Sequence, residues 1–171
     1  MVTGVKACGK TETARQAASS EVLLESDEAV SSAIAYDPSI LLEGSAPRLL
    51  DEWQEYPRIW NLVRRAVDAR LTTGQFILTG SSNPADQVML HSGVGRFSVM
   101  RMRTMTWHER GWSTGEVSLS DVIAGQPIAS KLVEPGVDSI CERLLTGGWP
   151  GLLGHDTDSA LAFARKGLSH N

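Results

Sequence analysis

The sequence predicts an α/β fold, and three segments support this prediction. A glycine-rich turn over residues 4–11 is followed by residues that favour a helix. The apolar pair Leu49 and Leu50 is followed by two acidic residues, and an apolar run at residues 76–78 breaks into a polar turn. Short apolar runs bounded by turn residues are typical of buried strands. Between these two segments, apolar residues recur at three- and four-residue spacing, which indicates a helix with one buried face.

The glycine-rich turn has the complete G-x-x-x-x-G-K-[ST] pattern of a phosphate-binding loop. Its glycines let backbone N–H groups turn towards phosphate oxygens, Lys10 would reach the β and γ phosphates, and the Thr11 hydroxyl would ligate Mg²⁺. A helix expected over residues 11–19 would add its positive end at the same place. The alternative is a glycine turn before a helix with no ligand. The predicted nucleotide-binding residues are Gly4, Val5, Lys6, Ala7, Cys8, Gly9, Lys10, Thr11 and Glu12.

The strand before this loop is expected to be truncated. A phosphate-binding loop normally follows a buried strand, and only three residues precede Gly4. Val2 and Thr3 favour strands, but strands usually run about five or six residues. The alternative is a loop that works without a full strand behind it. After the first helix, we expect a strand over residues 21–25 and a helix over residues 27–35.

The acidic pair Asp51 and Glu52 supplies the second half of the predicted site. Asp51 would hold Mg²⁺ through water, and Glu52 would orient and deprotonate the attacking water. Asp27 and Asp37 compete for the metal-binding role, but neither ends an apolar run as cleanly. The alternative is a helix N-terminus, because acidic residues favour first turns and an amphipathic run starts at Tyr56.

The apolar run at residues 76–78 is followed by polar residues, which we expect to lie at the same site. Ligands of such sheets gather at the carboxyl ends of the strands. Thr79, Ser81 or Asn83 would therefore hydrogen-bond the γ-phosphate or the attacking water. A plain strand-to-loop turn explains the same residues.

In order and spacing, these segments resemble the prokaryotic AAA-type ATPases that carry a C-terminal domain of unknown function. The resemblance implies a three-layer P-loop NTPase fold, with a mostly parallel sheet flanked by helices. It also implies that the strand of residues 76–79 separates the phosphate-loop strand from the strand before Glu52. It extends over about residues 1–150 and rests on residues 4–11, 49–57, 76–82 and 93–96.

The resemblance also implies roles for single residues. Lys10 and Thr11 correspond to the phosphate and magnesium residues, and Asp51 and Glu52 to the metal-binding and water-activating pair. Ser81 falls near the sensor position. Arg96 resembles an arginine finger, although an action within its own subunit stays open. The predicted catalytic residues are thus Glu52, Lys10, Arg96 and Ser81, the metal ligands are Thr11 and Asp51, and the cofactors are ATP and Mg²⁺.

The resemblance divides the chain into an ATPase core at residues 1–138 and the start of a truncated C-terminal region at residues 139–171. Before that boundary, arginines alternate with methionines at residues 100–105, as on a strand with either a basic edge or a solvated face over a methionine core. The resemblance implies a short helix at residues 107–110, and the residues themselves predict a short helix at residues 118–123 and a final helix at residues 140–145.

Composition and charge limit the possible locations and partners of the protein. No apolar stretch reaches the length of a membrane span and no signal peptide is evident, so we expect a cytoplasmic protein without membrane contact. A net charge of −4 does not support nucleic acid as a partner, and a homo-oligomer is left open. Two isolated cysteines offer no disulfide framework or zinc spacing.

The predicted function is ATP binding with Mg-dependent hydrolysis to ADP and phosphate. A GTPase or phosphotransferase is the competing enzyme class, but the sequence has no N-K-x-D-like guanine motif. The alternative outside enzymes is a nucleotide-dependent interaction module, or an inactive fragment without turnover.

Overall fold

The computed structural model describes residues 1–25, 28–80, 95–128 and 135–168. The chain forms two compact units, Met1–Arg103 and Thr104–Asn171. This division lies within the predicted core of residues 1–138, whose C-terminal boundary stays a prediction. None of the described helices is both long enough and apolar enough to cross a membrane.

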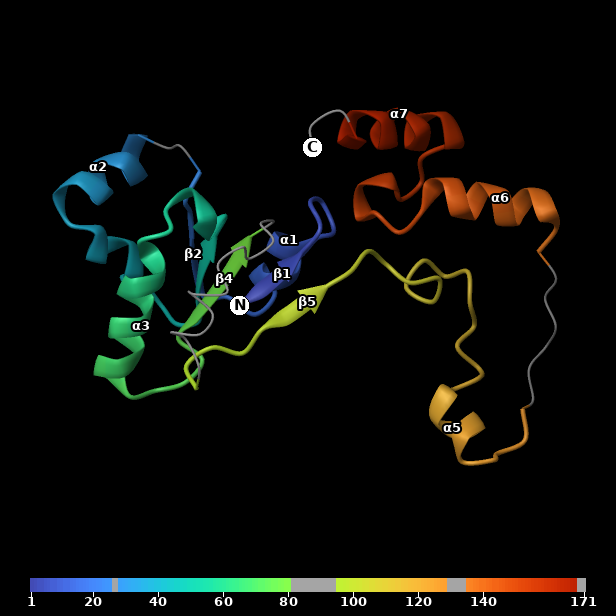
Figure 1. The fold of residues 1–171 in the computed structure, drawn as a ribbon, viewed down its shortest axis with the longest axis horizontal. Coiled ribbons are helices and arrows are strands. Elements are labelled where there is room, and N and C mark those ends of the chain that lie inside the picture. The colour runs from blue at the N-terminus through green and yellow to red at the C-terminus, as the bar shows by residue number, and fades with distance from the viewer. Residues whose placement is uncertain (26–27, 81–94, 129–134, 169–171) are drawn as a thin grey trace. The chain divides into compact units, whose positions relative to one another are not determined.

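The first unit is built on a parallel sheet of five strands in the order β2-β3-β4-β1-β5 (Figure 1). All pairings between these strands are parallel. The short strand β1 lies between β4 and β5, and β4 separates β1 from β3, which confirms the order that the family resemblance implies. The strands are β1 (Val2–Gly4), β2 (Ser20–Leu23), β3 (Arg48–Asp51), β4 (Phe76–Gly80) and β5 (Met100–Met102).

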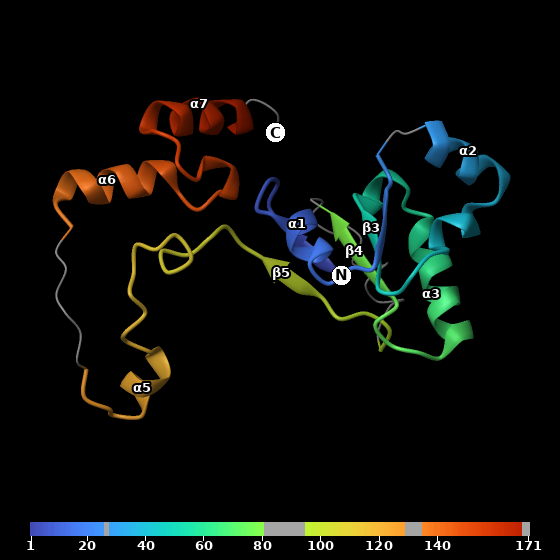
Figure 2. The ribbon, with the colours of Figure 1, turned by 180° about the vertical axis from the view of Figure 1, so that it is seen from behind.

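Helices cover both faces of this sheet, which confirms the predicted three layers. The helices are α1 (Lys10–Arg15), α2 (Glu28–Tyr36), the 3-10 helix η1 (Pro38–Leu42) and α3 (Ile59–Arg70). The chain first crosses from β1 to the edge strand β2 and then returns through β3 to β4. Because parallel connections are right-handed, this reversal places α1 on one face and α2 and α3 on the other (Figures 1 and 2).

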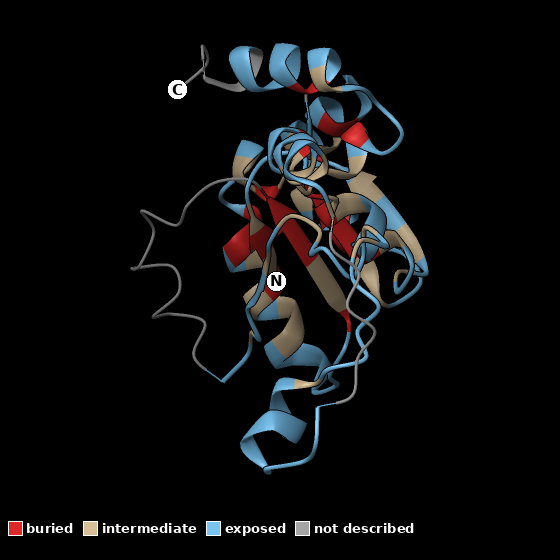
Figure 3. Ribbon diagram, turned by 90° about the vertical axis from the view of Figure 1, so that its right-hand side faces the viewer, coloured by how far each residue is buried: buried red, intermediate tan, exposed pale blue. Residues whose placement is uncertain are grey.

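The core of the first unit lies between the sheet and α3. Leu50 of β3 and Leu78 of β4 are buried against Ile59, Trp60 and Val63, which all lie on the apolar face of α3. Strands covered on both faces are nearly continuous apolar runs, which is why residues 76–78 could be recognised as a strand. The strand of residues 48–50 was recognised instead from Pro47 before it and the acidic pair after it. Figure 3 shows the buried residues gathered along these strands.

Some predicted ends differ from the observed ones. The helix expected to reach Ser19 stops at Arg15, because the Ser19 N–H donates to Pro47 O at 2.8 Å and the chain enters β2 at Ser20. The strand expected at residues 21–25 covers residues 20–23 instead.

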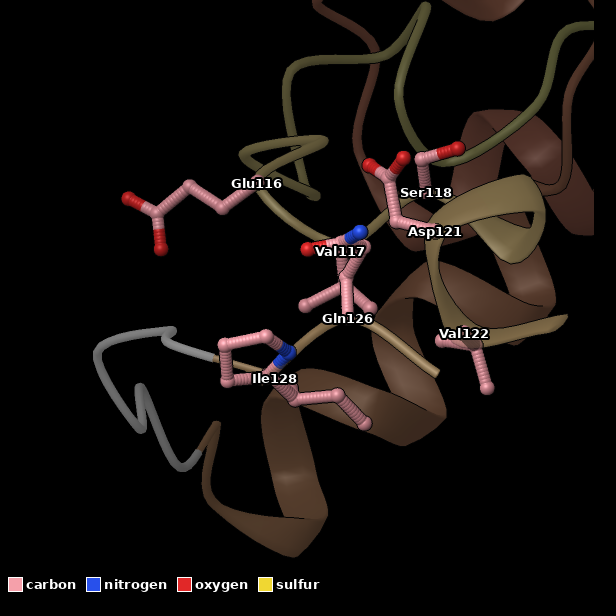
Figure 4. A pocket seen from close by; sticks show the side chains of 8 residues that line it. Glu116, Val117, Ser118, Asp121, Val122, Gln126 and Ile128 are labelled. Atoms are coloured by element: carbon pink, nitrogen blue, oxygen red, sulfur yellow. The ribbon is translucent and has the colours of Figure 1, made fainter. Parts of the chain in front are cut away.

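The second unit is helical. Its helices are α5 (Leu119–Ile123), α6 (Val137–Thr146), the 3-10 helix η3 (Pro150–Leu152) and α7 (Thr157–Leu168). The helix expected at residues 107–110 is wrong: these residues form turns, held where the Glu109 carboxylate accepts the Thr106 N–H and hydroxyl at 2.7 and 2.8 Å. A pocket of about 360 Å³ opens beside α5, and its lining mixes apolar side chains with Glu116 and Asp121 (Figure 4).

Candidate functional site

The glycine-rich turn links β1 to α1 at the carboxyl edge of the sheet. Gly9, the residue before α1, has φ of 97°, a left-handed conformation that glycine adopts without steric cost. Cys8, the residue before Gly9, is buried, with 2% of its surface exposed. The turn therefore has a backbone conformation that its second glycine makes accessible.

Lys10 lies inside this loop with only 6% of its surface exposed. Its ammonium donates to the carbonyl oxygens of Gly4 and Val5 at 3.2 and 3.0 Å. Burying a charge is costly unless polar partners surround it, and these carbonyls supply them. The loop thus holds the Lys10 ammonium at a place where a bound anion could replace the two carbonyl oxygens as its partners.

A cluster of oxygen atoms lies beside the loop and joins three elements. The Thr11 hydroxyl on α1 donates to the Asp51 carboxylate, 3.0 Å from each of its oxygens. The Thr79 hydroxyl on β4 also donates to Asp51 Oδ1. Asp51 is 6% exposed and Thr79 is fully buried. Since β3 and β4 are parallel neighbours, their carboxyl ends bring together residues 28 positions apart, and α1 adds the third group.

Glu52 follows directly and is half-buried. Its φ of 51° is left-handed, a conformation that costs free energy in a residue other than glycine and is concentrated at functional sites. This turn leads into the 3-10 helix η2 (Trp53–Glu55), where the Gln54 amide Nε2 donates to Glu52 Oε2.

These groups fit a magnesium-bound polyphosphate by their chemistry. Mg²⁺ prefers oxygen ligands, and Thr11 and Asp51 offer a hydroxyl and a carboxylate side by side. Of the competing carboxylates, Asp37 caps η1 by accepting the Ser39 N–H and hydroxyl, hydrogen bonds that lower the pKa of Asp37. Asp27 lies outside the described residues.

Arg96 does not lie with this group. Its guanidinium Nε is 2.6 Å from Asp68 Oδ1, and this hydrogen bond lowers the pKa of Asp68 and raises that of Arg96. Helix α3 runs from the carboxyl ends of the strands back to the start of β4, so Asp68 near its end lies at the amino edge. Ser81 and Asn83 lie outside the described residues.

The comparison with known families decides the chain's membership. A family model described as an AAA domain matches residues 1–110 of the 171. The chain belongs to this family. A search of curated proteins found no match. The matched part of the AAA domain includes the glycine-rich loop, Asp51, Glu52 and Arg96. Membership identifies the chain as a nucleotide-binding domain of ATPase type.

Two features of the AAA domain site were not predicted. Thr79 was one of three residues considered for a contact with the γ-phosphate or the attacking water, and its hydrogen bond to Asp51 was not predicted. Gln54 was given no role, although it lies only two residues after Glu52. No residue type in this turn indicates the left-handed conformation of Glu52 on which the contact depends.

Proposed function

We propose that this AAA domain binds Mg·ATP and hydrolyses it to ADP and phosphate. The observation that supports this most is the Thr11–Asp51 hydrogen bond, which places a hydroxyl and a carboxylate 40 positions apart in the sequence beside the buried Lys10. A buried cation next to paired oxygen ligands suits a phosphate group with its metal ion. A cytoplasmic location, where ATP is available, belongs to this proposal.

Each group would have a distinct role. Lys10 would exchange the Gly4 and Val5 carbonyls for phosphate oxygens, and Thr11 and Asp51 would hold Mg²⁺, the latter through water. The bound ion would neutralise negative charge on the phosphates. Glu52 would accept a proton from the attacking water, since a carboxylate at the end of β3 lies beside the metal residues.

The proposal is tested by measuring phosphate release from Mg·ATP by the parent protein and by Glu52→Gln. The amide cannot accept the proton, so we expect turnover to fall about 10²- to 10⁴-fold, with the affinity for Mg·ATP nearly unchanged. The exposed Glu55→Gln is the matched control and should hydrolyse at the parent's rate. Equal turnover in Glu52→Gln would assign the base elsewhere. Binding by the parent without hydrolysis would favour the nucleotide-dependent interaction module.

We further propose that Arg96 serves a neighbouring subunit of a homo-oligomer. Its place at the amino edge, paired with Asp68, supports this because its own Lys10 and Asp51 lie at the carboxyl edge. Turnover should then rise faster than linearly with protein concentration. Mixing Glu52→Gln with Arg96→Ala protein should restore part of the activity that each lacks, whereas a double variant mixed with either should not. No restoration on mixing would contradict the role in a neighbouring subunit.

A further inference from the structure

The side-chain amide of Gln54 is engaged at only one of its two ends. Its Nε2 donates to Glu52 Oε2, whereas its Oε1 is buried and has no hydrogen-bond partner among the residues that the structure describes. The reverse assignment of the amide would place its oxygen against the carboxylate, where both atoms only accept. A buried oxygen without a donor costs free energy comparable to that of a lost hydrogen bond. A donor that reaches Oε1 would therefore be favoured.

Gly80 and the Trp53 indole lie next to Oε1. A Cβ added to Gly80 would collide with Gln54 Oε1 and would lie 3.0 Å from the Trp53 indole. Gly80 is the last residue of β4 and follows Thr79, which bonds Asp51. The free oxygen therefore faces the carboxyl end of β4, on the edge of the sheet that holds Asp51 and Glu52. Trp53, the residue before Gln54, is 4% exposed and belongs to the core of this unit.

We propose that Gln54 binds the attacking water through Oε1 while Nε2 positions the Glu52 carboxylate. A water molecule has two hydrogens and two lone pairs. One hydrogen would be donated to Glu52 and the other to Gln54, which leaves a lone pair to point at the phosphorus. This inference rests on the proposed hydrolysis and adds a second residue that touches the water.

The step balances in atoms and electrons. The O–H bond of the water that points at Glu52 breaks, and its proton passes to the Glu52 carboxylate. The water oxygen forms a bond to the γ-phosphorus. The bond from that phosphorus to the bridging oxygen breaks, and its electron pair leaves with ADP. Gln54 loses and gains no proton. Its two hydrogen bonds fix where the water and the base lie during the transfer.

The test compares Gln54→Leu, which removes both polar ends, with the exposed Gln16→Leu as a matched control. Calorimetry measures affinity for Mg·ATP and for Mg·ADP with aluminium fluoride, a mimic of the transferred phosphoryl group, and phosphate release measures turnover. We expect Gln54→Leu to bind Mg·ATP within about twofold of the parent. Affinity for the mimic and turnover should each fall about tenfold or more, because only the transition state uses the positioned water. Gln16→Leu should match the parent in all three.

Unchanged affinity for the mimic in Gln54→Leu would overturn the inference, whatever the turnover. If this variant does not unfold cooperatively, the contact between Gln54 and Glu52 is tested instead by NMR, through the side-chain NH₂ resonance of Gln54 in the nucleotide-free parent. That resonance should shift in Glu52→Ala, and an unmoved resonance would overturn the contact. Normal turnover in the parent with an unaffected Gln54→Leu overturns this inference alone. A parent that does not bind Mg·ATP overturns the proposed function and this inference with it.

Discussion

In the unit Met1–Arg103, a parallel sheet buries its apolar residues under helices, whereas the helices of Thr104–Asn171 leave most of theirs in solvent. Among the described residues, the buried apolar side chains of the second unit are Leu152 and Ala160, and all others lie in the first unit. On α5 and α6, by contrast, Ile123 is 79% exposed and Val137 is 76% exposed.

The difference explains where a site could form. Side chains such as Lys10 and Asp51 keep a defined position only where the strands and helices that carry them are held by buried neighbours. The buried strands β3 and β4 provide this support. The short helices of the second unit have little buried surface, and helices of this length are marginal by themselves. The first unit should therefore account for both nucleotide binding and most of the stability.

The largest expected effect compares one leucine from each unit. Leu50→Ala in the first unit should lower the free energy of unfolding by about 2–5 kcal/mol, because Leu50 is fully buried. Leu144→Ala on α6 should change it by less than about 0.5 kcal/mol, because Leu144 is 66% exposed. Urea unfolding followed by tryptophan fluorescence measures both. Equal losses would break the distinction between the units.

A somewhat smaller effect should come from the nucleotide. Mg·ATP at about 100 times its dissociation constant should raise the free energy of unfolding of the first unit by about 2.7 kcal/mol. Hydrogen exchange should show slower exchange of the β3 and β4 amides and no change in α5. Lys10→Ala should abolish the gain, while Lys6→Ala, an exposed lysine of the same loop, should keep most of it. Protection spread evenly over both units would contradict the assignment.

A third, weaker effect concerns the contact between Arg143 and two tryptophans in the second unit. The Arg143 guanidinium on α6 lies 5.6 and 5.9 Å from the ring centroids of Trp112 and Trp107, which meet edge to face. Arg143→Ala should cost about 0.5–1 kcal/mol and change the near-UV circular dichroism of the tryptophans. The exposed Arg165→Ala on α7 is the control and should do neither. An identical spectrum in Arg143→Ala would contradict this contact.

The smallest effect concerns the ion pair between Arg96 and Asp68. Because Arg96 lowers the pKa of Asp68, folding favours the charged carboxylate. Its stabilisation is therefore present above the unfolded pKa of about 3.9 and is lost as the pH falls through the lower folded value. Urea unfolding of the parent and Asp68→Asn should show a small gap at about pH 7 that closes towards about pH 3. Asp138→Asn is the exposed control. A gap that widens on acidification would have the wrong sign.

Periodicity predicted the elements that a full core supports. Residues 76–78 and the run from Ile59 to Val67 were recognised because burial on both faces or on one stripe leaves a clear pattern. Residues 48–50 are too short to show a period, and they were recognised from Pro47 before them and the acidic pair after them. Helix α7 was missed, although the Asp156 carboxylate accepts the Ser159 N–H at 2.9 Å, a capping signal visible in the sequence. Its exposed residues leave no strong apolar pattern to detect.

The site was predictable to the extent that its chemistry follows a motif. Lys10 and Thr11 were named from the loop motif, and Asp51 from its place after Leu49 and Leu50 and from the family resemblance; the structure joins Thr11 to Asp51. The Gln54 contact depends on the left-handed turn at Glu52, and no residue type in that turn announces this conformation. The position of Arg96 depends on the direction of α3 relative to the sheet, which only the fold defines.

The most direct test of the central claim is a calorimetric titration of the protein with ATP. We predict saturable binding in the presence of Mg²⁺ and clearly weaker binding when EDTA removes the metal, because Thr11 and Asp51 would act on the nucleotide through Mg²⁺. GTP titrated in the same way should bind more weakly, as the sequence lacks a guanine motif. No saturable heat from Mg·ATP with the cooperatively folded protein would contradict a nucleotide site at this edge of the sheet.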